Sequence, residues 1–275
     1  MARNSNPVFN SASFQDQLKA GMAANSFETP TAGSLEEMYA QRPVPQGSTM
    51  TMQDVLNKVL LMALGVLAGG LAGWVAVSRL AASGSSFSTL MALAGGAGIA
   101  ALVIGLVNQF RREASPALSM LYSVLEGFLL GTLTGVLEIV YPGIALQAVL
   151  GTAAVFTVVM IGYRSGTFRT SPKSRRIVSI VAMAFVGFLL INWVLSLFGG
   201  GMNTFNGWIG VGIGLLGIGL GAFFLVTDFE DIQTAVENGA PKSFAWRCAF
   251  GLVLSIVWIY VEMLRLIASL RSLAD

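Results

Sequence analysis

The chain has 275 residues, of which 55% are hydrophobic and only 11% are charged, and its mean hydropathy is +0.73. Charged residues make up about a quarter of an ordinary soluble domain, so this composition excludes one. There is no histidine and only one cysteine, Cys248. Ser–His and Cys–His catalytic pairs, His/Cys zinc clusters and disulfide scaffolds are therefore excluded. With a formal net charge of only +2, we expect no nucleic-acid partner, no enzymatic activity and no organic cofactor.

Residues 1–53 differ in composition from the rest of the chain. They are rich in Asn, Ser, Thr, Gln and Pro and contain no long apolar run. Such a segment cannot bury enough apolar surface to offset its chain entropy. It also lacks the layout of a signal peptide, because no apolar run follows Arg3 closely. We expect a disordered tail over residues 1–53 that the mature chain keeps, and a folded domain over residues 54–275.

After this tail the chain consists of apolar runs about twenty residues long, the length that a helix needs to cross a hydrocarbon core of about 30 Å. The runs show no alternation of period two, which excludes a membrane β-barrel. The predicted fold is an all-α, polytopic bundle of seven transmembrane helices. They cover residues 55–78, 89–110, 117–140, 144–163, 177–198, 208–227 and 244–266.

The placement of basic residues predicts the topology, because short cytoplasmic loops of a cell-membrane protein retain Lys and Arg. The segments near 83–88, 141–143 and 199–206 contain none, whereas the loops after the second, fourth and sixth helices are basic. This pattern predicts a cytoplasmic N-terminus and, after seven crossings, a C-terminus outside. Arg265 and Arg271 oppose that rule, so a re-entrant final segment stays open. The basic loop residues are Arg111, Arg112, Arg164, Arg169, Lys173, Arg175, Arg176, Lys242 and Arg247.

Glycine recurs at i+3 and i+4 in the first and sixth predicted helices. Small residues at this spacing let helix backbones approach closely. We interpret both glycine faces as tight packing surfaces, and sliding of one helix against another is the functional alternative. The glycines are Gly65, Gly69, Gly70 and Gly73 in the first helix and Gly210, Gly212, Gly214, Gly217, Gly219 and Gly221 in the sixth.

Ionisable side chains inside a spanning helix are the candidates for function, because each costs at least about 2.5–3.5 kcal/mol to insert. Glu138 at a helix end and Glu230 and Asp231 near the inner interface can reach water, so we interpret them as structural. Glu262 and Arg265 are spaced i,i+3 and can pair on one helix face. We expect this pair to be structural or to form a gate, a polar lock, rather than an ion site.

Two acids lie deeper in the predicted bundle. Asp228 is about nine residues, roughly 13 Å, from the turn at 238–241, and Glu126 is about ten residues, roughly 15 Å, after Pro116. Two carboxyls at one level would compete for protons and, once deprotonated, attract a hard divalent cation such as calcium. Asp228 is the principal candidate ligand and Glu126 the candidate co-ligand of a pH-dependent calcium site. Spacing alone leaves open whether they form one.

Three segments carry a family resemblance: 122–131 (YSVLEGFLLG), 228–232 (DFEDI) and 258–266 (WIYVEMLRL). They resemble the Bax inhibitor family (transmembrane Bax inhibitor motif), in particular its bacterial YccA-like branch. The resemblance covers about residues 55–270 and leaves the tail outside. It implies seven helices with the last one central in the bundle, and the activity of a pH-sensitive calcium leak channel.

The resemblance also implies a pair of aspartates as the pH sensor, and here the sequence departs from it. Asp228 matches the first member, but the second falls near Ser255, and no acid occupies residues 253–257. Mirroring about the turn at 239–242 places Asp228 level with about residue 253, so Glu262 lies roughly 13 Å too far along the helix to replace the missing acid directly. Either Glu126 supplies the second carboxyl, or conduction and sensing differ in this chain. Arg111 or Arg112 is expected to neutralise Asp228, as arginines do in relatives, and so to belong to the gate.

The preferred function is therefore a pH-sensitive calcium leak channel, with membrane lipid and calcium ion as partners. The alternative is a non-conducting scaffold that regulates a membrane protease or another membrane protein, as relatives resembling YccA do. An intramembrane hydrolase is the least favoured class, because its Asp–Asp pair lacks a second member.

Overall fold

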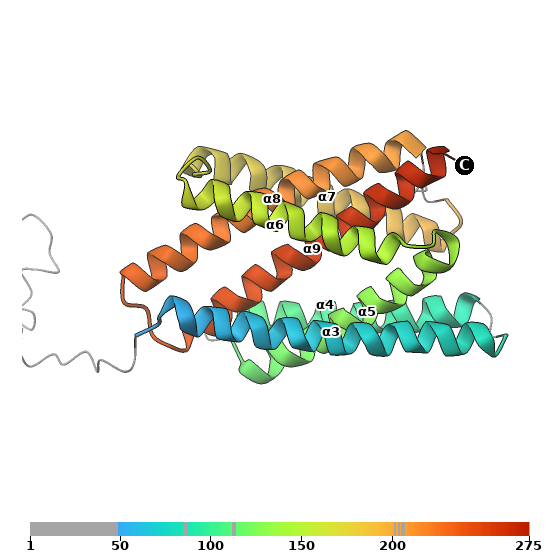
Figure 1. Ribbon diagram of the computed structural model, residues 1–275, viewed down its shortest axis with the longest axis horizontal. Helices are drawn as coiled ribbons and strands as arrows, with labels where there is room; N and C mark the ends of the chain where they lie inside the picture. The colour runs from blue at the N-terminus through green and yellow to red at the C-terminus, as the bar shows by residue number, and fades with distance from the viewer. Residues whose placement is uncertain are drawn as a thin grey trace, which may run out of the picture. The chain divides into compact units, whose positions relative to one another are not determined.

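The structure is a computed structural model that describes residues 49–84, 87–111, 114–200, 202, 204 and 207–274. Within these residues it is all-α, as predicted, with seven helices (Figure 1). They are α3 Met52–Ala82, α4 Phe87–Phe110, α5 Pro116–Val140, α6 Ile144–Arg164, α7 Pro172–Leu197, α8 Gly207–Glu237 and α9 Phe244–Ala274.

The first helix begins before the predicted end of the tail. The Thr51 hydroxyl accepts a hydrogen bond from the Asp54 backbone N–H, and the Asp54 carboxylate accepts one from the Thr51 N–H. This reciprocal cap satisfies donors that a helix start leaves free, so α3 starts at Met52. The rest of the predicted tail, up to residue 48, lies outside the described residues.

Six of the seven helices are long and apolar enough to cross a membrane. The exception is α4. Only its part Ala94–Phe110 counts as an apolar helix among the described residues, and this part is shorter than the six spans. The described chain is therefore a multi-pass membrane protein with six such spans instead of the predicted seven. The final segment is one uninterrupted helix of 31 residues rather than a re-entrant turn. The sides of the membrane on which the termini lie stay a prediction.

The last helix is central, as the family resemblance implies. In Figure 1, α9 runs between α3, α4 and α5 on one side and α6 and α8 on the other, and it packs against α3, α5, α6 and α8. Among the six spans, α9 has the largest buried share. Residues of α9 therefore line the surfaces where the two halves of the bundle meet.

A close crossing joins α3 to α5, which run parallel. A Cβ on Gly69 would lie 2.0 Å from the Val124 carbonyl oxygen, and one on Gly131 would lie 2.0 Å from the Gly70 carbonyl oxygen. Only glycine permits such an approach of two helix backbones. The crossing fixes the rotation of α5 about its axis, because Gly127 and Gly131 must face α3.

A second glycine row joins α8 to α9, which run antiparallel. Gly210, Gly214, Gly217 and Gly221 lie against α9 in order, and a Cβ on Gly217 would lie 2.5 Å from Cδ of Glu262. Gly212 and Gly219 have no heavy atom within 4 Å of such a Cβ. The predicted packing interpretation therefore applies to only one face of the glycine-rich helix.

Candidate functional site

The candidate cation site is built around Asp228, which lies half-buried in α8 where this helix passes α9. The Ser255 hydroxyl donates a hydrogen bond of 2.5 Å to Oδ2 of Asp228. A Cβ on Gly251 would lie 3.5 Å from Oδ1 of the same carboxylate. Asp228 is thus level with residues 251–255 of α9, in agreement with the level near residue 253 that mirroring about the α8–α9 turn predicts.

This arrangement offers one carboxylate and one hydroxyl. Calcium takes six to eight oxygen ligands, so the remaining ligands of a bound ion would be water and backbone carbonyls. Among the residues that the structure describes, no group of three or more His, Cys, Asp or Glu could hold a metal ion. The site therefore suits an ion in passage better than a tightly held structural ion.

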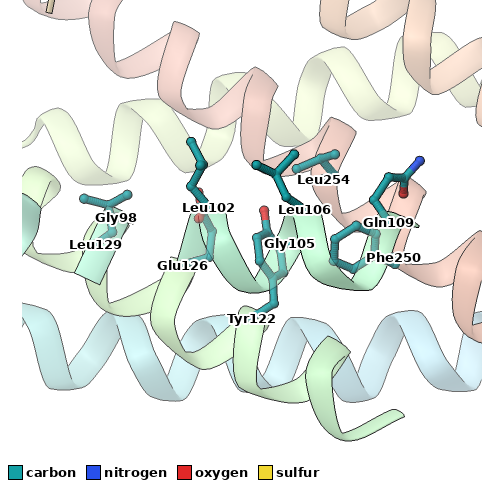
Figure 2. Close-up of a pocket in the computed structure, with 10 residues that line it drawn as sticks. All are labelled: Gly98, Leu102, Gly105, Leu106, Gln109, Tyr122, Glu126, Leu129, Phe250 and Leu254. Carbon is teal, nitrogen blue, oxygen red and sulfur yellow. The ribbon is translucent and has the colours of Figure 1, made fainter. Parts of the chain in front are cut away.

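Glu126 lies elsewhere. It lines a pocket between α4, α5 and α9 together with Phe250 and Leu254 (Figure 2). The residues of α9 that face Asp228 are Gly251 and Ser255. Phe250 comes one residue before Gly251, and Leu254 comes one residue before Ser255. Successive helical residues are turned by about 100°, so the two acids reach one level of α9 from different sides. No hydrogen bond joins the two carboxyls in the described chain, so the structure does not bring them together into the shared site that the sequence left open.

Of the two arginines expected to neutralise Asp228, Arg111 is the one within the described residues, and it does not pair with Asp228. Arg111 is exposed just after α4 and forms no ion pair in the described structure, while Arg112 lies outside the described residues. The cation that sequence reasoning missed is Arg175 of α7, which pairs with the neighbours of Asp228: Nη2 lies 2.8 Å from Glu230 Oε2 and Nη1 lies 2.7 Å from Asp231 Oδ1.

A backbone contact strengthens this cluster. The Thr170 N–H donates to Oε1 of Glu230 at 2.9 Å, which ties the loop between α6 and α7 to α8. The sequence carried a signal for this cluster: five basic residues follow the fourth apolar run, and three acids lie at the end of the sixth apolar run, on the same predicted side of the membrane. Positive loops and acids on one side of a membrane attract each other once the helices are assembled.

The predicted ion pair between Glu262 and Arg265 is present. Arg265 Nη1 lies 2.6 Å from Glu262 Oε2 and 2.8 Å from Oε1, and the two residues are only 6% and 2% exposed. Glu138, interpreted as structural, accepts hydrogen bonds from the backbone N–H groups of Gly143 and Ala145 at the start of α6. Glu262 is thus held by an ion pair and Glu138 by two backbone N–H groups. Asp228 accepts a hydrogen bond only from Ser255, and Glu126 has no hydrogen bond or ion pair within the described residues.

Comparison with family models gives one match, described as Bax inhibitor 1 like, over residues 6–272. The match covers the helical bundle up to two residues before the end of α9, and nearly all of the segment before the bundle. The expectation that the tail lies outside the resemblance is therefore wrong. Comparison with curated proteins finds no match.

Proposed function

Because the chain belongs to the Bax inhibitor 1 like family and forms a membrane bundle, we propose that it is a pH-sensitive cation leak channel with calcium as its preferred ion. The observation that carries the proposal is the Asp228 carboxylate, which is held by Ser255 and has no ion pair in the described chain. A carboxylate inside a spanning helix costs at least about 2.5–3.5 kcal/mol, and a passing cation offsets that cost.

The surroundings of Asp228 support a response to pH. The charged groups around it are Asp231 of α8 and Arg175 of α7, and these two pair with each other. Asp228 is therefore free to exchange a proton for a cation. Protonation removes its charge, so a proton and a calcium ion compete for the same carboxylate.

Calcium flux into liposomes that contain the full-length protein tests the proposal. We expect Asp228→Asn to lower flux severalfold, because it removes the charge and keeps the size. Glu237→Gln, at an exposed acid near the end of α8, is the matched control and should retain the wild-type flux. Equal flux in wild type and Asp228→Asn, with both proteins folded, would refute the assignment.

One observation favours the scaffold alternative. The family match begins at residue 6, and the residues that follow the tail are tied to the α8–α9 turn: Met50 N–H donates to the Ala240 carbonyl at 2.7 Å, and Lys242 Nζ lies 3.1 Å from Asp54 Oδ1. A membrane protein that binds the tail would thereby act on the turn between α8 and α9. Deletion of residues 1–48 should then abolish partner capture and leave calcium flux intact.

A further inference from the structure

The Glu126 pocket is separate from the Asp228 site and has its own chemistry. Its volume is about 370 Å³, within the size range of small-molecule sites. Figure 2 shows the side chains of Tyr122 and Glu126, four residues apart on α5, extending toward Leu102 and Gly105 of α4. Among the described residues that line it, Glu126 is the only carboxyl, and the remaining walls are mostly leucine, glycine and phenylalanine.

The pocket faces the lipid phase. Its rim residues Leu102, Leu106 and Leu254 are 53%, 49% and 45% exposed, and in a membrane bundle such apolar side chains face acyl chains. Glu126 lies about ten residues, roughly 15 Å, along α5 from Pro116, near the middle of a hydrocarbon core of about 30 Å. A ligand of this pocket therefore enters from the bilayer and has an apolar body.

The polar groups of the pocket favour an organic cation. Glu126 has no hydrogen bond or ion pair within the described part of the chain, so its charge calls for a partner from outside. Beside it, the rings of Tyr122 and Phe250 lie with their centroids 4.9 Å apart and are tilted by 59°. Both rings line the pocket, although the two residues are each only 3% exposed. Aromatic rings attract organic ammonium groups, and aromatic cages recognise quaternary ammonium ligands.

A divalent metal fits the same pocket poorly. Calcium needs six to eight oxygen ligands, whereas the lining offers one carboxylate, one phenol and the amide of Gln109. We propose that this pocket binds the ammonium head of a membrane-partitioned alkylamine. Glu126 neutralises its charge, Tyr122 and Phe250 contact its methyl groups, and the leucine rim holds its alkyl chain.

The test is equilibrium binding of radiolabelled decyltrimethylammonium to the full-length protein in lipid nanodiscs. Its uncharged analogue, in which carbon replaces the ammonium nitrogen, has the same shape and measures apolar binding alone. We expect saturable binding of the cation at one site and no saturable binding of the analogue. Glu126→Gln should weaken binding of the cation by about tenfold or more, and Glu237→Gln should leave its affinity unchanged.

Two further variants keep the test decisive. Phe250→Leu keeps the Glu126 carboxylate and removes one ring, so it should weaken binding of the cation by about three- to tenfold. Asp228→Asn should leave binding unchanged, so a failed calcium assignment and a failed alkylamine assignment are distinguishable. The proposal is overturned if cation and analogue bind equally, or if a folded Glu126→Gln or Phe250→Leu protein binds the cation as wild type does.

Discussion

The hydroxyl of Ser255 donates a hydrogen bond of 2.5 Å to the carboxylate of Asp228, so α9 presents a hydroxyl where the family resemblance implies a second acid. Ser255 is itself buried, and its hydroxyl has one proton to donate, which it gives to Asp228. The candidate site thus has one negative charge, placed at the contact of the two helices that the glycine row holds together.

Ser255→Asp is expected to restore a two-carboxyl site. Two carboxylates supply more charge and more oxygen ligands than one, and calcium affinity rises with ligand charge count. We expect the calcium concentration for half-maximal flux to fall by about tenfold, measured on liposomes at neutral pH. Ser255→Asn has a similar size without the charge and serves as the control. If the Asp and Asn variants behave alike, Ser255 does not face the conducted ion.

Acidification should weaken calcium binding in the wild-type protein. Protonation neutralises Asp228, so the calcium concentration for half-maximal flux should rise as pH falls and recover as pH rises. Asp228→Asn cannot titrate at this position, and its residual flux should lose this dependence. The measurement is a calcium titration of flux at several pH values. A pH response that persists unchanged in Asp228→Asn would assign the sensor to another group.

The sequence predicted the helices and the level of Asp228 because both follow from local rules. Apolar runs mark the helices, and antiparallel helices joined by a short turn mirror each other, which places residue 253 opposite Asp228. The face on which each acid lies is not a local property. Gly127 must face α3, and Glu126, one residue earlier, is thereby turned toward α4 instead of toward Asp228.

The pairing of Arg175 could not be predicted for a related reason. Basic residues were evident in the loop between α6 and α7, but which one reaches Glu230 depends on the path of that loop. The Thr170 N–H fixes this path by donating to Glu230. The contact between Thr170 and Glu230 therefore decides which of the five basic residues pairs with Glu230, and the sequence alone does not distinguish among them.

Gly217→Ala should destabilise the contact of α8 with α9. A Cβ at this position would lie 2.5 Å from Cδ of Glu262, and the Gly217 carbonyl accepts a hydrogen bond of 2.9 Å from Trp258 Nε1. We expect a loss of about 1–3 kcal/mol in the free energy of unfolding. Gly219→Ala, in the same helix with open space around it, should be neutral or stabilising by up to about 1 kcal/mol. Denaturation in detergent compares them, and equal losses would contradict the one-sided glycine row.

Arg175→Gln should release the loop between α6 and α7 from α8. The ion pair with Asp231 is largely exposed and contributes about 0.2–1 kcal/mol at most, whereas Glu230 is more buried and also holds the Thr170 N–H. We expect faster hydrogen exchange at Thr170 and little change in global stability. Arg176→Gln, at an exposed neighbour with no ion pair in the described residues, is the control. Unchanged exchange at Thr170 in Arg175→Gln would mean that the backbone contact alone holds the loop.

Glu262→Gln should be the most destabilising of the single changes, because it removes the carboxylate that pairs with the buried guanidinium of Arg265. Removing one member of a buried ion pair costs about 3–5 kcal/mol, whereas replacing both members by apolar residues is often neutral. Glu262→Leu combined with Arg265→Met should therefore recover most of the stability that Glu262→Gln loses, as measured by denaturation.

Flux through the same proteins then decides whether the pair is only structural. In a structural pair, the stable double variant conducts calcium as wild type does. In a polar lock, replacing both charges removes the ion pair whose Glu262 lies beside Gly217 of α8, so resting flux rises severalfold while the pH response at Asp228 persists. The two sites lie on the same pair of helices but about two turns apart along α9, so each can be changed without direct contact with the other.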